Sequence, residues 1–200
     1  MKITVICEKE ARISAALGIV GALIFLFAFP KGSISTLAHD VLGLPGPGAG
    51  IGLVFGPFLI IVAVVSSVLS RGSGGALVTS LMFAVAYALI VHLFRIPTSQ
   101  KGAFGSSLFI GAVTVFSVVA EVVMALGKRL NTVWRCILCG AVANVALLVI
   151  YWTVIFPGTA GWIHRSDVPV LLGLCFACGV VAGCVAWGIS RPLSKSFAVK

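Results

Sequence analysis

Six long apolar segments make up most of this chain, and nearly all of its charged residues lie in the gaps between them. A membrane-spanning helix needs roughly 20 mostly apolar residues to cross the ~30 Å hydrocarbon layer of a bilayer. Backbone groups in lipid must be hydrogen-bonded within their own segment, which requires helices rather than open strands. The sequence therefore predicts an all-α, polytopic membrane protein with six transmembrane helices, over residues 13–29, 51–69, 76–94, 108–126, 136–156 and 168–190.

The composition agrees with this fold class. Hydrophobic residues make up 60% of the chain and charged residues 10%, whereas about a quarter of the residues in a soluble domain are charged. Six spans in 200 residues leave no room for a separate soluble domain. We therefore expect one integral membrane domain over residues 1–200, folded as one compact bundle. The first segment is longer than the apolar core of about 7–15 residues in a signal peptide, so we expect an uncleaved helix.

The basic residues predict the orientation of the bundle. Cytoplasmic loops of membrane proteins carry an excess of lysine and arginine. With the N-terminus inside, the inner segments hold ten basic residues and the outer loops four. We therefore expect a multi-pass protein of the cell membrane with both termini cytoplasmic. The net charge of +9 forms no compact patch, which argues against nucleic-acid binding. The inner residues are Lys2, Lys9, Arg12, Arg71, Lys128, Arg129, Arg135, Arg191, Lys195 and Lys200, and the outer ones are Lys31, Arg95, Lys101 and Arg165.

The gaps on the two sides differ in length. The inner gaps, 70–75 and 127–135, are short, whereas the outer gaps cover 30–50, 95–107 and 157–167. Long loops in compact proteins usually carry function. The first outer gap is rich in glycine, but a phosphate-binding loop would need a following Lys-Ser or Lys-Thr and a strand-to-helix setting. We interpret these residues as a tight return of the chain into the second helix: Gly43, Gly46, Gly48, Gly50 and Gly52.

Polar and aromatic residues on the predicted outer side form a candidate ligand site. Aromatic, histidine and carboxylate groups above an apolar bundle suit a small, flat ligand that is polar or cationic. The alternative is anchoring at the membrane surface, where Trp and Tyr are enriched. We interpret Trp134 and Trp187, on the inner side, as such anchors. The candidate binding residues are His39, Asp40, Tyr87, His92, Trp162, His164 and Asp167, and Arg165, Tyr151 and Trp152 lie near them in the predicted topology.

The spacing of the histidines, serines and acidic residues gives little support for a catalytic or metal site. The three histidines show no HxH or HxxxH spacing, which leaves a nickel, cobalt or zinc site as a minor alternative. No serine-histidine-acid set and no paired carboxylates occur within the spans. We therefore expect no enzymatic activity, no catalytic residue, no resident metal and no cofactor.

Two CxxC pairs, Cys136/Cys139 and Cys175/Cys178, would suggest zinc or redox chemistry in a soluble protein. At ~1.5 Å per residue, the predicted spans put the two pairs roughly 15–20 Å apart in depth, too far to share one metal. We interpret these cysteines as packing residues. A thiol-redox enzyme is the alternative, and it would need a pair exposed to water.

Glu121 is the only acidic residue inside a predicted span. Ionisable residues in membranes are costly and often functional. Its carboxylate lies about two helical turns from Lys128 and Arg129. The sequence leaves two roles open, a structural or partner-facing role and a role as a proton relay.

Small residues recur at four-residue intervals at the start of the first span. Ala11/Ala15, Ser14/Gly18 and Gly18/Ala22 give three such steps, and this spacing lets another helix approach closely. Gly179 and Gly183 in the last span repeat the pattern. The approaching helix can belong to a partner protein or to the same bundle.

These features together resemble the substrate-binding S components of energy-coupling factor (ECF) transporters. The segment from Ala11 to Gly18 (ARISAALG) resembles the AxxxA segment by which that family docks its coupling subunit. Residues 56–63 (GPFLIIVA) and 71–84 (RGSGGALVTSLMFA) are similar to the second and third helices of S components. The similarity is greatest to the type that binds thiamine precursors.

The resemblance implies a membrane-embedded subunit that captures a vitamin or vitamin precursor on the outer side, with thiamine or hydroxymethylpyrimidine as the first candidates. The three outer gaps would act as lids. The implied partners are membrane lipid, a membrane coupling subunit and two cytoplasmic ATPases, with Ala11, Ala15 and Gly18 at the docking surface. The alternative from the residues alone is a non-transporting structural or accessory subunit of a membrane complex.

Overall fold

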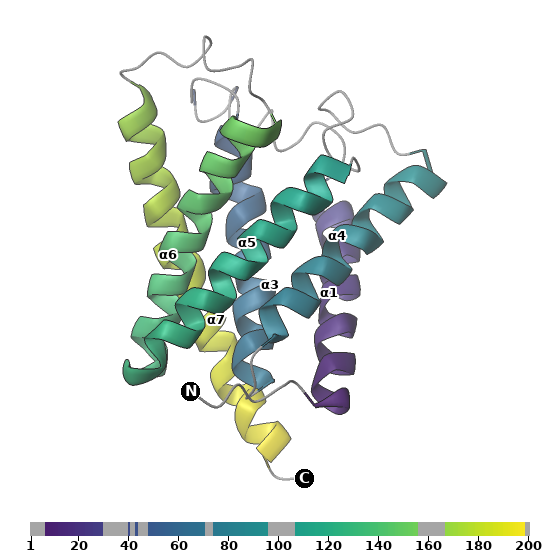
Figure 1. Ribbon diagram of the computed structural model, residues 1–200, viewed down its shortest axis with the longest axis vertical. Coiled ribbons are helices and arrows are strands. Elements are labelled where there is room, and N and C mark those ends of the chain that lie inside the picture. The colour runs from purple at the N-terminus through teal and green to yellow at the C-terminus, as the bar shows by residue number, and fades with distance from the viewer. Residues whose placement is uncertain are drawn as a thin grey trace.

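The computed structural model describes residues 7–29, 40, 43, 48–70, 74–95, 107–155 and 167–198. Within these ranges every regular element is a helix (Figure 1). In chain order the elements are α1 (Glu8–Ala28), the π-helix η2 (Ile51–Phe55), α3 (Gly56–Leu69), α4 (Gly75–Leu93), α5 (Ser107–Leu126), the 3-10 helix η3 (Gly127–Arg129), α6 (Thr132–Ile150), the π-helix η4 (Tyr151–Ile155) and α7 (Asp167–Ala198).

The predicted six-helix membrane fold is confirmed. Six helical segments in the described ranges are long and apolar enough to cross a membrane, and the second, Ile51–Leu69, has the predicted bounds. α1 begins at Glu8, five residues before the predicted start. Two polar contacts stabilise this first turn: the Cys7 N–H donates to Glu10 Oε2 at 3.2 Å, and Glu8 pairs with Arg12. Hydropathy does not detect a helical turn made of charged residues.

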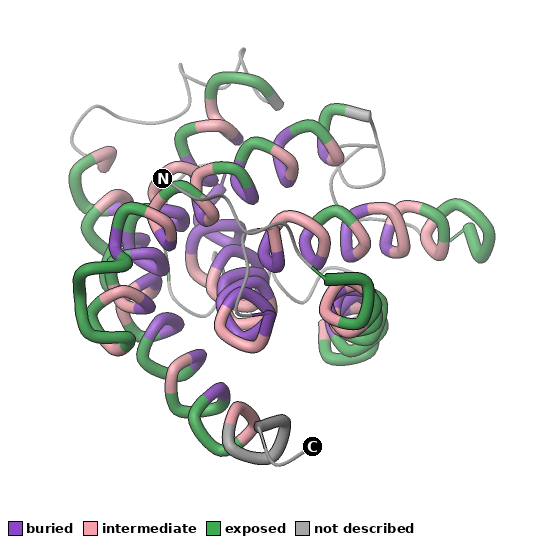
Figure 2. The backbone as a smooth tube through the Cα atoms, turned by 60° about the horizontal axis from the view of Figure 1, so that its bottom comes forward, coloured by how far each residue is buried: buried purple, intermediate pink, exposed green. Residues whose placement is uncertain are grey.

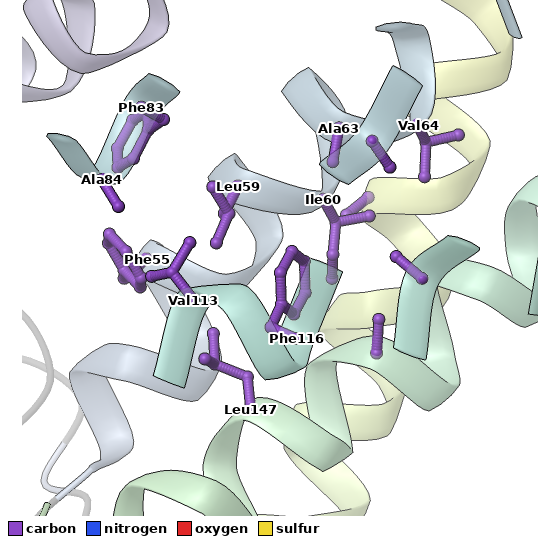
Figure 3. Packing of buried hydrophobic residues seen from close by; sticks show 14 of the residues in the cluster. Phe55, Leu59, Ile60, Ala63, Val64, Phe83, Ala84, Val113, Phe116 and Leu147 are labelled. Carbon is purple, nitrogen blue, oxygen red and sulfur yellow. The ribbon is translucent and has the colours of Figure 1, made fainter. Parts of the chain in front are cut away.

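α3 lies at the centre of the bundle (Figures 1 and 2). It contacts α1, α4, α5, α6 and α7, and its span is the most buried of the six. The segment contains no charged residue, which is compatible with burial on every side. Figure 3 shows Leu59 and Ile60 of α3 packed among side chains of α5 and α6.

The outer surface of the bundle is apolar. Large hydrophobic side chains are exposed on its helices, including Phe27, Leu126 and Val181. Figure 2 shows the exposed residues on the outward sides of the helices and the buried ones facing inward. Soluble monomers rarely expose contiguous apolar patches larger than a few hundred Å². A surface of this kind fits contact with lipid chains.

The small residues of the two glycine patterns face neighbouring helices of the same chain. A Cβ at Gly18 would overlap the backbone oxygen of Thr79 in α4. A Cβ at Gly179 would overlap the Gly140 oxygen in α6, and one at Gly183 would overlap the Cys136 oxygen. The spacing therefore serves close helix crossings within the bundle, α1 with α4 and α6 with α7.

Three buried hydroxyl groups join α1, α3 and α4. Ser66 Oγ lies 2.8 Å from Ser14 Oγ and 3.1 Å from the Gly75 oxygen. Thr79 Oγ1 lies 2.6 Å from Ser66 Oγ and 2.9 Å from the Ser14 oxygen. Interhelical hydrogen bonds of this kind contribute to the association of membrane helices.

Replacing Thr79 with valine keeps the side-chain shape and removes the hydroxyl group. We expect Thr79→Val to lower the free energy of unfolding by about 1 kcal/mol, because two interhelical hydrogen bonds are lost. Thr153→Val is the matched control, since the Thr153 hydroxyl in η4 bonds carbonyls of the same span, at Val149 and Ile150 in α6, and joins no other span. Unfolding in detergent, followed by circular dichroism, measures both. An equal loss of stability in Thr79→Val and Thr153→Val would contradict a role of the Thr79 hydroxyl in joining the helices.

Candidate functional site

The bundle has two distinct ends. α1 begins and α7 ends at one of them, called here the terminal end (Figure 1). At the opposite end α1 and α4 end, η2 precedes α3, α6 continues into η4, and α5 and α7 begin. We call this the loop end. The described residues that flank the three predicted outer gaps lie at this end.

Among the described residues, seven aromatic rings from the first four membrane spans meet toward the loop end. Neighbouring ring centroids are 5.1 to 6.2 Å apart. Phe25 packs edge-on against Phe55 at 5.2 Å, and Phe83 stacks on Tyr87 at 6.1 Å with an interplanar angle of 8°. The aromatic cluster consists of Phe25, Phe29, Phe55, Phe58, Phe83, Tyr87 and Phe109.

The rings of the aromatic cluster are largely buried against one another. Phe55 of η2 and Phe83 of α4 lie with Val113 of α5 in the core of the bundle (Figure 3). Aromatic rings offer flat, polarizable faces that can stack on a ligand ring or attract a cation. The cluster therefore gives the loop end an aromatic base, and Tyr87 is its one member that carries a hydroxyl group.

The chain returns into the second span at Gly48. This residue has φ +100°, a conformation that favours glycine. Its oxygen accepts hydrogen bonds from the N–H groups of Ile51 and Gly52, at 3.0 and 2.9 Å. A Cβ at Gly48 would lie 3.0 Å from both Leu148 Cδ1 and Trp152 Nε1. The predicted tight return is borne out at Gly48, which lies against the end of α6, while Gly46 lies outside the described residues.

In the described ranges 48–70 and 107–155, two π-helices occur at the loop end, η2 before α3 and η4 after α6. Both contact α6, and η2 also contacts α7. Short π-helices inside α-helices are rare overall, and many of those that occur lie at functional sites. The hydropathy pattern of the sequence does not predict these π-helices.

The structure describes four of the seven predicted binding residues. Tyr87 is buried in the aromatic cluster, His92 is exposed in the last turn of α4, Asp40 is exposed, and Asp167 is half-buried at the first position of α7. α4 ends and α7 begins at opposite sides of the loop end (Figure 1), so His92 and Asp167 do not converge. The other three, His39, Trp162 and His164, lie outside the described residues.

The phenylalanines of the aromatic cluster were absent from the predicted site. A partial signal for them existed, since Phe25, Phe55 and Phe109 lie in the outer halves of their spans and Phe83 lies near the middle of its span. Tyr151, at the end of α6, is buried in the same core, and Trp152 is half-buried against it.

The aromatic residues at the terminal end have different surroundings. Trp134 is exposed near the start of α6. In α7, the Arg191 guanidinium lies 5.5 Å from the centre of the Trp187 ring. Tryptophan beside arginine at the end of a span is typical of the membrane interface.

Glu121 stabilises the start of α4. Its Oε1 accepts hydrogen bonds from the N–H groups of Ala76 and Leu77, at 2.7 and 3.4 Å. The first N–H groups of a helix have no partner within the helix, and a carboxylate there interacts favourably with the helix dipole. This geometry fits the structural role and assigns Glu121 no part in proton transfer.

The buried cysteines pack between helices. Cys139 Sγ donates to the Ala120 oxygen at 3.5 Å, and Cys175 Sγ donates to the Asn144 oxygen at 3.2 Å. These contacts are those of packing residues. Among the residues that the structure describes, no group of three or more His, Cys, Asp or Glu is placed to hold a metal ion.

No protein-family model matches the sequence, and no curated protein is significantly similar to it. The fold, however, is similar to that of a solved structure, a crystal structure of "an S-component of ECF transporter". The superposition has a TM-score of 0.71 and covers 95% of this chain and 86% of the other, with 21% sequence identity. The chain therefore has the six-helix fold of that S component.

Proposed function

We propose that this protein is the substrate-binding S component of an ECF-type uptake transporter. The observation that carries the proposal is the similarity of fold, which extends over 95% of this chain and 86% of the solved S component. A match of that extent includes all six spans and their order. A generic helix pair or a single shared motif would cover far less of either chain.

The proposed orientation places the loop end outside the cell membrane and both termini in the cytoplasm. The described basic residues support it, because most of them share the terminal end of the bundle while Arg95 lies at the loop end. Those at the terminal end are Lys9, Arg12, Lys128, Arg129, Arg135, Arg191 and Lys195.

In this proposal the ligand binds at the loop end, above the aromatic cluster. A vitamin or vitamin precursor with a flat ring, such as thiamine or hydroxymethylpyrimidine, suits the ring faces and carboxylates there. The buried position of Tyr87 supports a place at the base of the site. His92 and Asp167 lie at opposite sides of the loop end, so a ligand of this size would contact one or the other of them. The proposed contacts remain His39, Asp40, Tyr87, His92, Trp162, His164 and Asp167.

The proposed partners are a membrane coupling subunit and cytoplasmic ATPases. Ala11 and Ala15 are half-buried on α1 near the terminal end, with the exposed Arg12 and Ala16 beside them, so this face is open to a docking helix. Gly18, by contrast, faces α4 of the same chain. We therefore centre the proposed docking surface on Ala11 and Ala15.

Thermal unfolding of the purified protein in detergent, against a panel of vitamins and their precursors, tests the proposal. A compound that binds only the folded state stabilises it by about 2.7 kcal/mol at a hundredfold excess over Kd. We expect one compound of the panel to raise the midpoint, and we expect ATPase subunits to co-purify. A panel without any shift, together with no co-purifying ATPase, would contradict the proposal and favour an accessory subunit.

A matched pair of variants tests the location of the site. Trp162→Ala removes a proposed contact, and Trp134→Ala removes an exposed tryptophan at the terminal end. We expect only Trp162→Ala to reduce the shift produced by the active compound. If the compound raises the unfolding midpoint equally in both variants and the wild type, Trp162 does not contact the ligand.

A further inference from the structure

Asn144, in α6, connects three elements of the bundle at one buried point. Its side chain is fully buried, at 0% exposure. Its Nδ2 group donates to the Gly52 oxygen of η2 at 2.8 Å and to the Cys175 oxygen of α7 at 2.7 Å. The Cys175 thiol donates in return to the Asn144 backbone oxygen at 3.2 Å.

The Gly52 carbonyl needs this donor because its own helix does not provide one. In a regular α-helix the N–H of Gly56 would donate to it, but that group donates to the Ile51 oxygen, five residues back. The next residue, Pro57, has no N–H. A carbonyl without a partner in an apolar bundle is strongly unfavourable. Asn144 therefore supplies the hydrogen bond that the π-helical geometry and Pro57 remove.

The geometry also fixes the orientation of the amide. Asn144 Oδ1 has no hydrogen-bond partner among the described residues and lies against Gly56, where a Cβ would overlap it. A flipped amide would direct Oδ1 at two carbonyl oxygens and lose both hydrogen bonds. Only glycine at position 56 leaves room for the amide in this orientation.

We propose that Asn144 is the positioning residue of the loop end, which holds η2 in its π-helical form and connects it to α7. A return of η2 to regular α-helix would rotate the preceding residues by about 100° relative to α3. Gly48 would then leave its place against Trp152, and the bond from α6 to η2 would break. The consequence for ligand binding rests on the function proposed above, whereas the conformational role does not.

A double-mutant cycle between Asn144 and Pro57 tests this role. Asn144→Leu keeps a similar volume and removes the donor, while Pro57→Ala adds an N–H five residues after Gly52, which can donate to the Gly52 oxygen in the π-helical form. We expect Asn144→Leu to lower the unfolding midpoint by about 5 °C. We expect amide exchange in residues 48–58 to become about tenfold faster or more. Pro57→Ala should recover most of both losses and have little effect alone.

The control is Thr114→Val in α5, because the Thr114 hydroxyl bonds only the Ile110 oxygen of its own helix. It should leave exchange in residues 48–58 unchanged. If Asn144→Leu does not fold, Asn144→Ser takes its place in the same cycle. Wild-type exchange in residues 48–58 of the Asn144 variant would overturn the proposal. So would independent, additive effects of the two substitutions.

Thiamine, used as the probe, separates this role from the proposed function. If thiamine raises the midpoint of the wild type, Asn144→Leu should weaken that effect and Pro57→Ala should restore it. If thiamine affects no variant, the exchange measurements still decide the conformational role, because they need no ligand. Thiamine binding that stays at the wild-type level in Asn144→Leu, despite faster exchange, would overturn the role of Asn144 in positioning the site.

Discussion

Gly179→Ala and Gly183→Ala are each expected to lower the free energy of unfolding by about 2–3 kcal/mol, a large effect for one methyl group. At Gly179 the added Cβ would overlap the Gly140 oxygen and lie 2.8 Å from the Gly140 carbonyl carbon. These are backbone atoms, which cannot move aside without separating α6 from α7. Thermal or denaturant unfolding in detergent, followed by circular dichroism, measures the loss.

Two other glycines of α7 provide the control for this prediction. A Cβ at Gly173 or Gly188 would meet no atom within 4 Å. Alanine is a better helix former than glycine by about 1 kcal/mol, so Gly173→Ala and Gly188→Ala should leave stability unchanged or raise it slightly. If all four variants behave alike, α6 and α7 do not cross at Gly140. If Gly179→Ala and Gly183→Ala keep wild-type stability but lose partner binding, these glycines pack against a helix of the partner.

The glycine patterns show which part of the helix packing can be predicted from the sequence. Four-residue spacing predicts a helix face that permits close approach, and this was correct for Gly18 as well as for Gly179 and Gly183. The spacing does not show which helix packs against this face, because that depends on the arrangement of the whole bundle. For the same reason the sequence alone does not distinguish the open face of α1 around Ala11 and Ala15 from the face at Gly18 that packs on α4.

The membrane spans were predictable because they depend on local hydropathy. The π-helix η2 was not, because its stabilising donor, Asn144, lies 92 residues from Gly52 in the chain. Pro57 is visible in the sequence, but proline at the first turn of a helix is common and does not by itself predict a π-helix. Contacts of this kind arise only when the tertiary fold brings distant segments together.

The candidate site shows the same limit. Histidines and acids were selected by residue type, and the structure leaves His92 and Asp167 on opposite sides of the loop end. The aromatic cluster arises from convergence of four helices. No single segment of the sequence shows that Phe25 will meet Phe55 and Phe83.

Phe83→Ala is expected to lower the free energy of unfolding by about 2–4 kcal/mol. The ring is fully buried, and it contacts Phe25, Phe55, Phe58 and Tyr87. In a bilayer the transfer of a side chain from lipid to the bundle contributes little, since both surroundings are apolar. The loss therefore comes from the cavity and from the ring contacts, which places it below the range for soluble cores.

Phe27→Ala is the matched control, because this ring is 83% exposed on the outer face of α1. We expect its midpoint of unfolding to stay close to that of the wild type, since detergent or lipid replaces the contacts of an outward ring. Phe83→Leu, which refills part of the cavity, should recover part of the stability lost in Phe83→Ala. A wild-type midpoint in Phe83→Ala would show that the cluster is loosely packed, and the loop end would then need another rigid base. If Phe83→Leu is stable but loses the response to the active vitamin, the ring faces themselves contact the ligand, and the cluster is part of the binding site rather than its support.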